Sequence, residues 1–249
     1  MDNVKKTFSK PGCIYLSKLG FIRLRNHREF PASAVSRVNI KYHAGKWYAN
    51  LTAELPDVAP GEDSAKPVGI DVGINHFAIL SDGTFIENPK HFRKLEKKLA
   101  KEQRRLSRKI KGSNNRGKAK GKVAKIHAKI ANQRKDFLHQ TSASIVKNYS
   151  TIVMEDLKVR NMTRNHKLAK SIHDASWSRF KTYIEYKCKR QGKDLILVDT
   201  RGTSQTCLCG ELVRKDLSVR IHECPTCGLR MNRDLVSAKL ILERGLKTA

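Results

Sequence analysis

The chain has 249 residues and a formal net charge of +28, from 51 Lys and Arg against 23 Asp and Glu. Hydrophobic residues make up 39% of it, which suits one or two folded domains and excludes a charged, disordered arm. No segment approaches the roughly 18 apolar residues of a membrane span, and the N-terminus has no apolar signal core. We therefore expect no membrane partner and no secretion. So large a charge excess favours a polyanion, with nucleic acid as the usual partner.

Most of this charge lies in one segment. Residues 90–135 carry 19 basic and 2 acidic residues, a net +17 of the total +28. Apolar residues recur there at helical spacing on both sides of GSNNRGKAKG (112–121). We expect a hairpin of two long helices over 90–148, joined by a basic, mobile turn at 112–121. A hairpin with a merely solvated face is the alternative, but such faces mix both charge signs. Binding to a nucleic-acid backbone is the favoured interpretation.

The chain before this hairpin is predicted to be β-rich. Residues 12–55 contain alternating β-formers separated by Gly-containing turns, and the Pro-, Gly- and Asp-containing segment 56–67 marks a boundary. We place a small β unit at 1–60 and a second domain at 67–249. The strands expected in the β unit are Cys13–Leu16, Phe21–Leu24, Val35–Tyr42 and Lys46–Leu55.

The second domain alternates compact apolar strands with helices, which indicates an α/β fold. Ser171 and Asp174 fit a capping box before a helix that ends near Gly192, and a last helix is expected from about Asn232 to Gly245. One face of the earlier helix carries Trp177, Phe180, Ile184 and Cys188. The expected strands are Val68–Val72, His76–Leu80, Thr84–Glu87, Ser150–Glu155 and Leu195–Val198.

Four of the six cysteines fall within 21 residues. They form the pairs Cys207/Cys209 and Cys224/Cys227, each followed by Gly, as in knuckles that turn the backbone toward a metal. Four thiolates satisfy one tetrahedral Zn²⁺ ion, although the first pair has the tighter C-x-C spacing. A disulfide pair and a redox CxxC are the weaker alternatives. His222 is a possible competing ligand, and we expect it instead on the surface of the ribbon.

Three acids stand out in so basic a chain. Asp71 lies within the apolar strand GIDVG, Glu155 closes the apolar run IVME, and Asp234 opens the last helix. Each alone could be an ordinary surface acid. Together, three carboxylates on separate elements suit hard divalent cations that act on phosphodiesters. Asp156 and Asp199 are rivals by composition, although side-chain alternation places Glu155 and Asp156 on opposite faces.

Five motifs now form one pattern. They are GIDVGINHFAILSDG (69–83), IVMEDLKVRNM (152–162), TSQTCLCG (203–210), HECPTCG (222–228) and NRDLVSA (232–238). In this order they resemble the transposon-encoded TnpB (OrfB) family, related to type V CRISPR effectors, over essentially all of 12–246. The resemblance implies an RNase H-like RuvC nuclease domain, interrupted by the helical hairpin and by a zinc ribbon at 203–231. It also implies that the first residues are part of a wedge-like β-barrel.

The resemblance also implies an activity. The chain would be an endonuclease that cuts DNA with the help of a guide RNA and divalent metal ions. Its catalytic, magnesium-binding triad falls on Asp71, Glu155 and Asp234, and not on Asp156 or Asp199. Two Mg²⁺ ions, or Mn²⁺ in their place, would act there, and one structural Zn²⁺ would be held by the four cysteines. DNA and a guide RNA are the implied partners, in the cytoplasm and nucleoid of a prokaryote.

Relatives carry further segments before the point where this chain starts, so we expect an N-terminally truncated form. Those segments are the front of the barrel and a helical recognition lobe. A non-cleaving nucleic-acid-binding derivative, either a remnant or a repressor-like protein, is therefore the alternative function. A strand-joining transposase is weaker, because a zinc ribbon before the last acid does not favour it.

Overall fold

The computed structural model describes residues 8–26, 29–54, 66–199, 201–216 and 219–248. Contacts divide the chain into two compact units. The first combines residues 1–57 with 105–128, and the second combines 58–104 with 129–249. Most of the expected boundary segment 56–67 lies outside the described residues. No helix in the described part is both long and apolar enough to cross a membrane.

The first unit contains two antiparallel β-hairpins. The longer hairpin turns at Ala44 and Gly45, whose φ angles of 51° and 87° match the twist of a tight two-residue turn. Among the described residues the hairpins form separate two-stranded sheets, so no barrel sheet joins them. The elements are β1 (Cys13–Leu16), β2 (Gly20–Arg23), the short 3-10 helix η1 (Ala32–Ala34), β3 (Val35–His43) and β4 (Lys46–Ala53).

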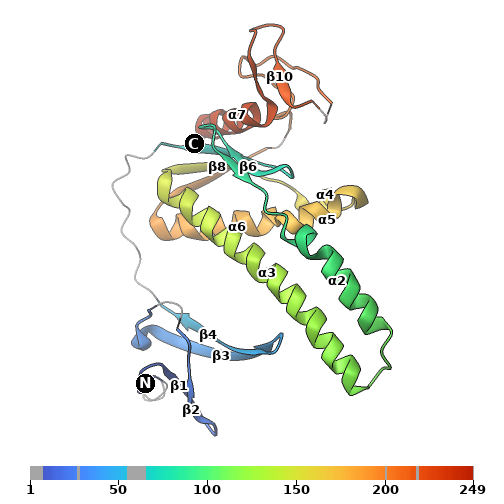
Figure 1. The fold of residues 1–249 in the computed structure, drawn as a ribbon. Coiled ribbons are helices and arrows are strands. Elements are labelled where there is room, and N and C mark those ends of the chain that lie inside the picture. The colour runs from blue at the N-terminus through green and yellow to red at the C-terminus, as the bar shows by residue number, and fades with distance from the viewer. Residues whose placement is uncertain (1–7, 27–28, 55–65, 200, 217–218, 249) are drawn as a thin grey trace. The chain divides into compact units, whose positions relative to one another are not determined.

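The basic segment forms two long helices, α2 (His91–Ser107) and α3 (Asn114–Asn148), as the sequence predicted (Figure 1). The prediction of a mobile turn at 112–121 is wrong, however. Helix α3 already begins at Asn114, so most of the Gly- and Lys-rich segment is helical and only a short link joins α2 to α3.

Side chains at this link explain why α3 begins early. The Ser113 hydroxyl accepts a hydrogen bond from the backbone N–H of Arg116 at 3.2 Å, the usual N-cap geometry. The Arg116 guanidinium donates to the carbonyl oxygens of Leu106 (3.2 Å) and Lys109 (2.9 Å), at the end of α2. These bonds occupy backbone groups that the two helix ends leave unpaired.

A five-stranded sheet forms the centre of the second unit. Its strand order is β7-β6-β5-β8-β9, with β5, β8 and β9 parallel and β6 and β7 antiparallel to their neighbours. The sequence predicted all five strands to within about one residue. Their bounds are β5 (Val68–Val72), β6 (His76–Leu80), β7 (Phe85–Glu87), β8 (Thr151–Glu155) and β9 (Asp194–Val198).

Helices cover the two faces of this sheet. On one face, Phe180 and Ile184 of α6 pack with Phe77 and with the C-terminal part of α3. On the other face, Ile241 of α7 packs with Val153. Figure 1 shows the sheet between α6 and α7. The helices are α4 (Val159–Met162), α5 (His166–Ala175), α6 (Trp177–Gln191) and α7 (Arg233–Thr248).

Helix α7 lies unusually close to the strands beneath it. A Cβ atom added to Gly69 would lie 2.2 Å from the Ala238 carbonyl oxygen, and one added to Gly245 would lie 2.4 Å from Cγ1 of Val153. Glycine is therefore required at both crossings. The prediction that the last helix ends at about Gly245 is therefore wrong. Gly245 is a packing residue within a helix that continues to Thr248.

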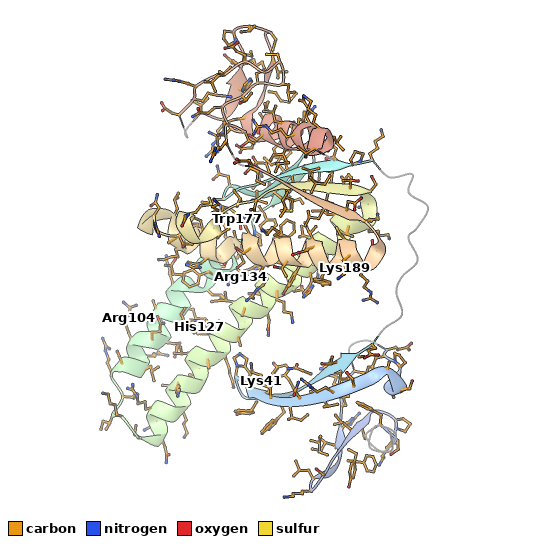
Figure 2. All side chains as sticks on the ribbon, turned by 180° about the vertical axis from the view of Figure 1, so that it is seen from behind. Lys41, Arg104, His127, Arg134, Trp177 and Lys189 are labelled. Atoms are coloured by element: carbon orange, nitrogen blue, oxygen red, sulfur yellow. The ribbon has the colours of Figure 1, made fainter. Side chains whose placement is uncertain are left out.

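The predicted capping box at Ser171 is also wrong. Ser171 and Asp174 lie inside α5, and α6 begins only after Ser176, whose φ is 57°. The Asp174 carboxylate instead accepts hydrogen bonds from the Phe92 backbone N–H at 3.0 and 3.1 Å and from Arg134 Nη2 at 2.9 Å. Asp174 thus joins α5 to α2 and α3. Figure 2 marks Arg134 on α3.

Candidate functional site

Asp71 and Glu155 lie near the carboxyl ends of two adjacent parallel strands, Asp71 one residue before the end of β5 and Glu155 at the end of β8. The register of β5 and β8 places them side by side at the carboxyl edge of the sheet. Successive strand residues point to opposite faces, so Asp71 shares the face of Gly69 and Glu155 shares the face of Val153. Gly69 and Val153 both contact α7. The two carboxylates therefore lie on the α7 side of the sheet.

Asp234 enters from the first turn of α7. The Asn232 side chain caps this helix, because its Oδ1 accepts the backbone N–H groups of Asp234 (2.9 Å) and Leu235 (3.2 Å). Arg233 Nη2 lies 3.0 Å from Oδ1 of Asp234, and Arg220 Nη1 lies 3.7 Å from Oδ2. The Asp234 carboxylate is thus fixed at the helix start, next to two guanidinium groups.

The Glu155 and Asp234 carboxylates both act electrostatically on Asp71, although among the described residues only the four cysteines bring their ligand atoms within 4.8 Å of one another. Burial raises the pKa of Asp71 well above its ordinary value, and the nearby negative charges of Glu155 and Asp234 raise it further, against the opposing charge of Arg233. Burial likewise raises the pKa of Glu155, while Arg244 opposes the shift. The protein thus concentrates negative charge where solvation is poor, and a bound cation would relieve this cost.

Sequence reasoning missed a residue that contacts this group. The Thr203 hydroxyl donates a 2.5 Å hydrogen bond to Oε1 of Glu155, and Thr203 is only 5% exposed. This hydrogen bond lowers the pKa of Glu155 and so opposes the effect of burial. A threonine in a polar loop gives no sequence signal, because its role comes from the fold around it.

The two rival acids have other partners. Asp156 pairs with Lys181 of α6 at 2.8 Å, on the face opposite Glu155, as side-chain alternation predicted. Asp199 lies 3.6 Å from Nε of Arg201. Both acids line a groove of about 550 Å³ at the carboxyl ends of β8 and β9. Neither carboxylate raises the pKa of Asp71 in the way that Glu155 and Asp234 do.

The four cysteines come together as the sequence predicted, with their sulfur atoms within 4.8 Å of one another. The Sγ atoms of Cys207 and Cys227 lie 3.6 Å apart, and those of Cys209 and Cys224 lie 3.7 Å apart. Metal–sulfur bonds of about 2.3 Å give a tetrahedron with edges of about 3.8 Å, whereas a disulfide needs about 2.05 Å. The spacing fits four thiolates around one metal ion.

Tight backbone turns form this cluster. Gly210 and Gly228, which follow the two cysteine pairs, have φ angles of 92° and 71°, as expected for residues that must turn sharply. The Gly228 N–H donates to the Cys224 carbonyl at 3.0 Å, and the Gly210 N–H donates to the Cys207 carbonyl at 2.9 Å. The cluster lies beside a short antiparallel pair, β10 (Ile221–Glu223) and β11 (Arg230–Asn232).

The prediction that His222 lies on the surface of this segment is wrong. Its side chain is fully buried, and its Nδ1 contacts Nζ of Lys215. It is the middle residue of β10 and the only one of the three that points inward. So small a unit has few apolar side chains, and the imidazole helps to fill its interior. His222 does not join the four cysteines as a possible ligand.

Two family models match most of the chain. A model described as "Probable transposase" (OrfB_IS605) matches residues 50–166, and one described as "Cas12f1-like, TNB domain" matches residues 177–241. The first match spans the strand carrying Asp71 and the strand carrying Glu155. The second spans the four cysteines and Asp234.

Named relatives agree with these matches. The chain is 43% identical over 206 residues to the "Putative RNA-guided DNA endonuclease" of Streptomyces pristinaespiralis, covering 82% of this chain and 51% of the relative. It is 38% identical over 249 residues to "Putative RNA-guided DNA endonuclease InsQ" of Escherichia coli K12, covering 93% and 62%. The chain belongs to the TnpB (OrfB) family. It spans about half to three fifths of the length of these two relatives.

Solved structures share the fold. A cryo-EM structure of a CRISPR-Cas12f ternary complex matches with a TM-score of 0.55 at 24% identity, over 79% of this chain and 42% of that one. A Cas12f1–sgRNA–target DNA complex matches with a TM-score of 0.51 at 22% identity, over 82% and 55%. The chain thus has a Cas12f-like α/β fold with a mixed sheet.

Proposed function

We propose that this chain carries the catalytic part of an RNA-guided, metal-dependent DNA endonuclease of the TnpB type. One observation carries the proposal: Asp71 and Glu155 lie side by side at the carboxyl edge of the sheet on the side of α7, and Asp234 lies in the first turn of that helix. The strand order β7-β6-β5-β8-β9, with its first three strands antiparallel, supports an RNase H-like RuvC domain. The two named relatives and the Cas12f structures support the RNA-guided activity.

The donor set suits magnesium. Carboxylate oxygens are the ligands that Mg²⁺ and Mn²⁺ prefer, and a cation would relieve the crowding of negative charge around Asp71. Asp71, Glu155 and Asp234 would hold two such ions. When bound, the ions supply an activated water and stabilise charge on the phosphate, for hydrolysis to 5′-phosphate and 3′-hydroxyl ends.

The four-cysteine cluster is proposed as a structural zinc site within a ribbon over 203–231. All four positions are sulfur, so Cys207, Cys209, Cys224 and Cys227 leave no open position for a substrate. Metal binding there would stabilise a segment whose short strands bury little apolar surface. The ribbon leads directly into Asn232 and Asp234, so this zinc would also fix the start of α7.

The basic hairpin is proposed to hold the guide–target duplex. The net +17 of residues 90–135 suits a phosphate backbone, which a protein can grip without reading sequence. Sequence would be read by pairing of the guide RNA with DNA. Figure 2 marks Arg104 on α2 and His127 on α3, two positions along this hairpin.

The decisive test compares the wild-type chain with Asp71→Ala in a cleavage assay with Mg²⁺, DNA and guide RNA. We expect Asp71→Ala to abolish cutting and to leave salt-sensitive DNA binding nearly unchanged, because the binding charge lies elsewhere. Cutting that survives Asp71→Ala would refute the site. Equal binding by both chains, with no cutting by either, would favour the non-cleaving nucleic-acid-binding alternative.

A further inference from the structure

Thr203 lies at the point where three parts of the second unit meet. Its hydroxyl donates to Glu155 at the end of β8, with 2.5 Å between Oγ1 and Oε1. Its backbone carbonyl accepts a hydrogen bond from Ser237 Oγ of α7 at 3.3 Å. Four residues later the chain reaches Cys207, the first of the clustered cysteines. Thr203 therefore connects a carboxylate, a helix and the cysteine cluster.

Two anchors on α7 hold this segment. Ser237 is 3% exposed, so its bond to Thr203 is shielded from water. Two helical turns further on, Arg244 Nη1 donates to the carbonyl of Arg201 at 2.7 Å. Gly202, with a φ of 75°, turns the backbone between the two anchored carbonyls. Thr203 therefore reaches Glu155 from a backbone fixed to the helix that carries Asp234.

Such a contact limits how the Glu155 carboxylate turns. Glutamate has three rotatable side-chain bonds, and a carboxylate that binds a cation loses that freedom on binding. A hydroxyl that holds Oε1 beforehand reduces this loss and leaves Oε2 free to accept a ligand bond. Groups that orient metal ligands in this way typically change metal affinity by about 10- to 100-fold when they are removed.

We propose that Thr203 is a positioning residue for Glu155, and that through it the segment leading into the cysteine cluster sets the conformation of this carboxylate. The inference rests on the proposed function, because it assumes that Glu155 binds a divalent cation. It adds a residue outside the carboxylate set. It also adds a physical connection between the cluster and that set.

The test measures Mn²⁺ binding by electron paramagnetic resonance in the full chain with its zinc retained. Thr203→Val keeps the shape of the side chain and removes the hydroxyl, and we expect it to weaken Mn²⁺ binding about 10-fold. Thr203→Ser keeps the hydroxyl and should stay within about twofold of wild type. Thr182→Val is the matched control, because the Thr182 hydroxyl donates to the Ser178 carbonyl at 3.1 Å on α6, outside this segment. It should bind Mn²⁺ like wild type.

The outcomes separate the two claims. Wild-type affinity in Thr203→Val, with reduced affinity in Asp71→Asn, would overturn the role of Thr203 and leave the proposed function intact. Equal affinity in wild type and Asp71→Asn would refute the proposed function itself. If Thr203→Val loses its near-UV circular dichroism or its zinc, Thr203→Ala is titrated in its place. Weak binding by Thr203→Ser would also overturn the proposal, because its hydroxyl is present.

Discussion

At the scale of single residues, the Asp71 carboxylate is the most unfavourably placed charge of the site. Burial and two neighbouring carboxylates raise its pKa, so the folded chain holds its proton more tightly than the unfolded chain does. For such a group, metal-free stability is greatest below the ordinary pKa of 3.8 and falls as pH rises toward the raised value. The same carboxylate is a cation ligand once it is deprotonated.

Asp71→Asn should therefore stabilise the chain when no Mg²⁺ or Mn²⁺ is present. We expect a higher unfolding temperature than wild type near neutral pH, by roughly 2–4 °C per kcal/mol of repulsion removed, and a smaller difference as the pH is lowered toward 3.8. Thermal unfolding followed by circular dichroism measures both. Asp156→Asn is the control, because Lys181 lowers the pKa of Asp156, and it should gain no stability. A destabilised Asp71→Asn chain would contradict this account.

Residue by residue, the three acids carry a sequence signal that the residues around them lack. Asp71 and Glu155 stand out because an acid within an apolar strand or at its end is uncommon. Thr203 has no such signal, since its contact with Glu155 depends on how α7 and β8 are packed. His222 is buried, although a polar side chain next to a cysteine pair suggests a surface position, because a segment with so few apolar residues uses the imidazole to fill its interior.

At the scale of elements, the strands follow directly from short apolar runs, whereas the helix ends depend on specific side-chain bonds. The pattern 112–121 reads as a turn by composition, yet Ser113 and Arg116 cap the adjoining helix ends. Likewise, Asp174 looked like part of a capping box but binds Phe92 and Arg134, more than 35 residues away in sequence. Long-range bonds of this kind cannot be read from local spacing.

Gly121→Ala tests the revised helix. Gly121 lies within α3, has no positive φ, and an added Cβ would meet no atom within 4 Å. Alanine should therefore stabilise the hairpin tip by roughly 0.5–1 kcal/mol. Amide hydrogen exchange over residues 114–124 should slow in the variant. Unchanged, fast exchange would indicate that this segment is a turn after all.

Gly69→Ala tests the close crossing of α7 over β5. The added methyl group would lie 2.2 Å from the Ala238 carbonyl, so the helix must move away from the strand. We expect a loss of roughly 1–3 kcal/mol in unfolding free energy, measured by urea denaturation, together with weaker Mn²⁺ binding. Gly117→Ala is the control, because a Cβ added to Gly117 would meet no atom within 4 Å and its φ is not positive. Normal stability in Gly69→Ala would contradict the packing described.

Removal of zinc tests whether a metal ion holds the segment around the four cysteines together. Elemental analysis should give about one zinc per chain, and a chelator should increase hydrogen exchange over 203–231 first. Cys224→Ser should lower zinc content and produce the same loosening without a chelator. A metal-free chain with unchanged exchange would refute the zinc site.

At the scale of the whole molecule, +17 of the net charge of +28 lies in residues 90–135, a segment of the sequence that contains none of Asp71, Glu155 and Asp234. Lys118→Gln combined with Lys122→Gln should reduce the salt dependence of DNA binding by up to about 2 in the slope of log K against log salt. Lys189→Gln combined with Arg190→Gln, at the end of α6, removes the same charge. Fluorescence anisotropy at several salt concentrations compares the two. Equal effects would mean that only the net charge matters.

The central claim is that Asp71, Glu155 and Asp234 together bind divalent cations. Counting bound Mn²⁺ ions by electron paramagnetic resonance, in wild type and in Asp71→Asn with zinc retained, tests it most directly. We predict two Mn²⁺ ions per wild-type chain and strongly reduced binding in Asp71→Asn, because Glu155 and Asp234 both act electrostatically on Asp71. Wild-type Mn²⁺ binding in Asp71→Asn would contradict the account.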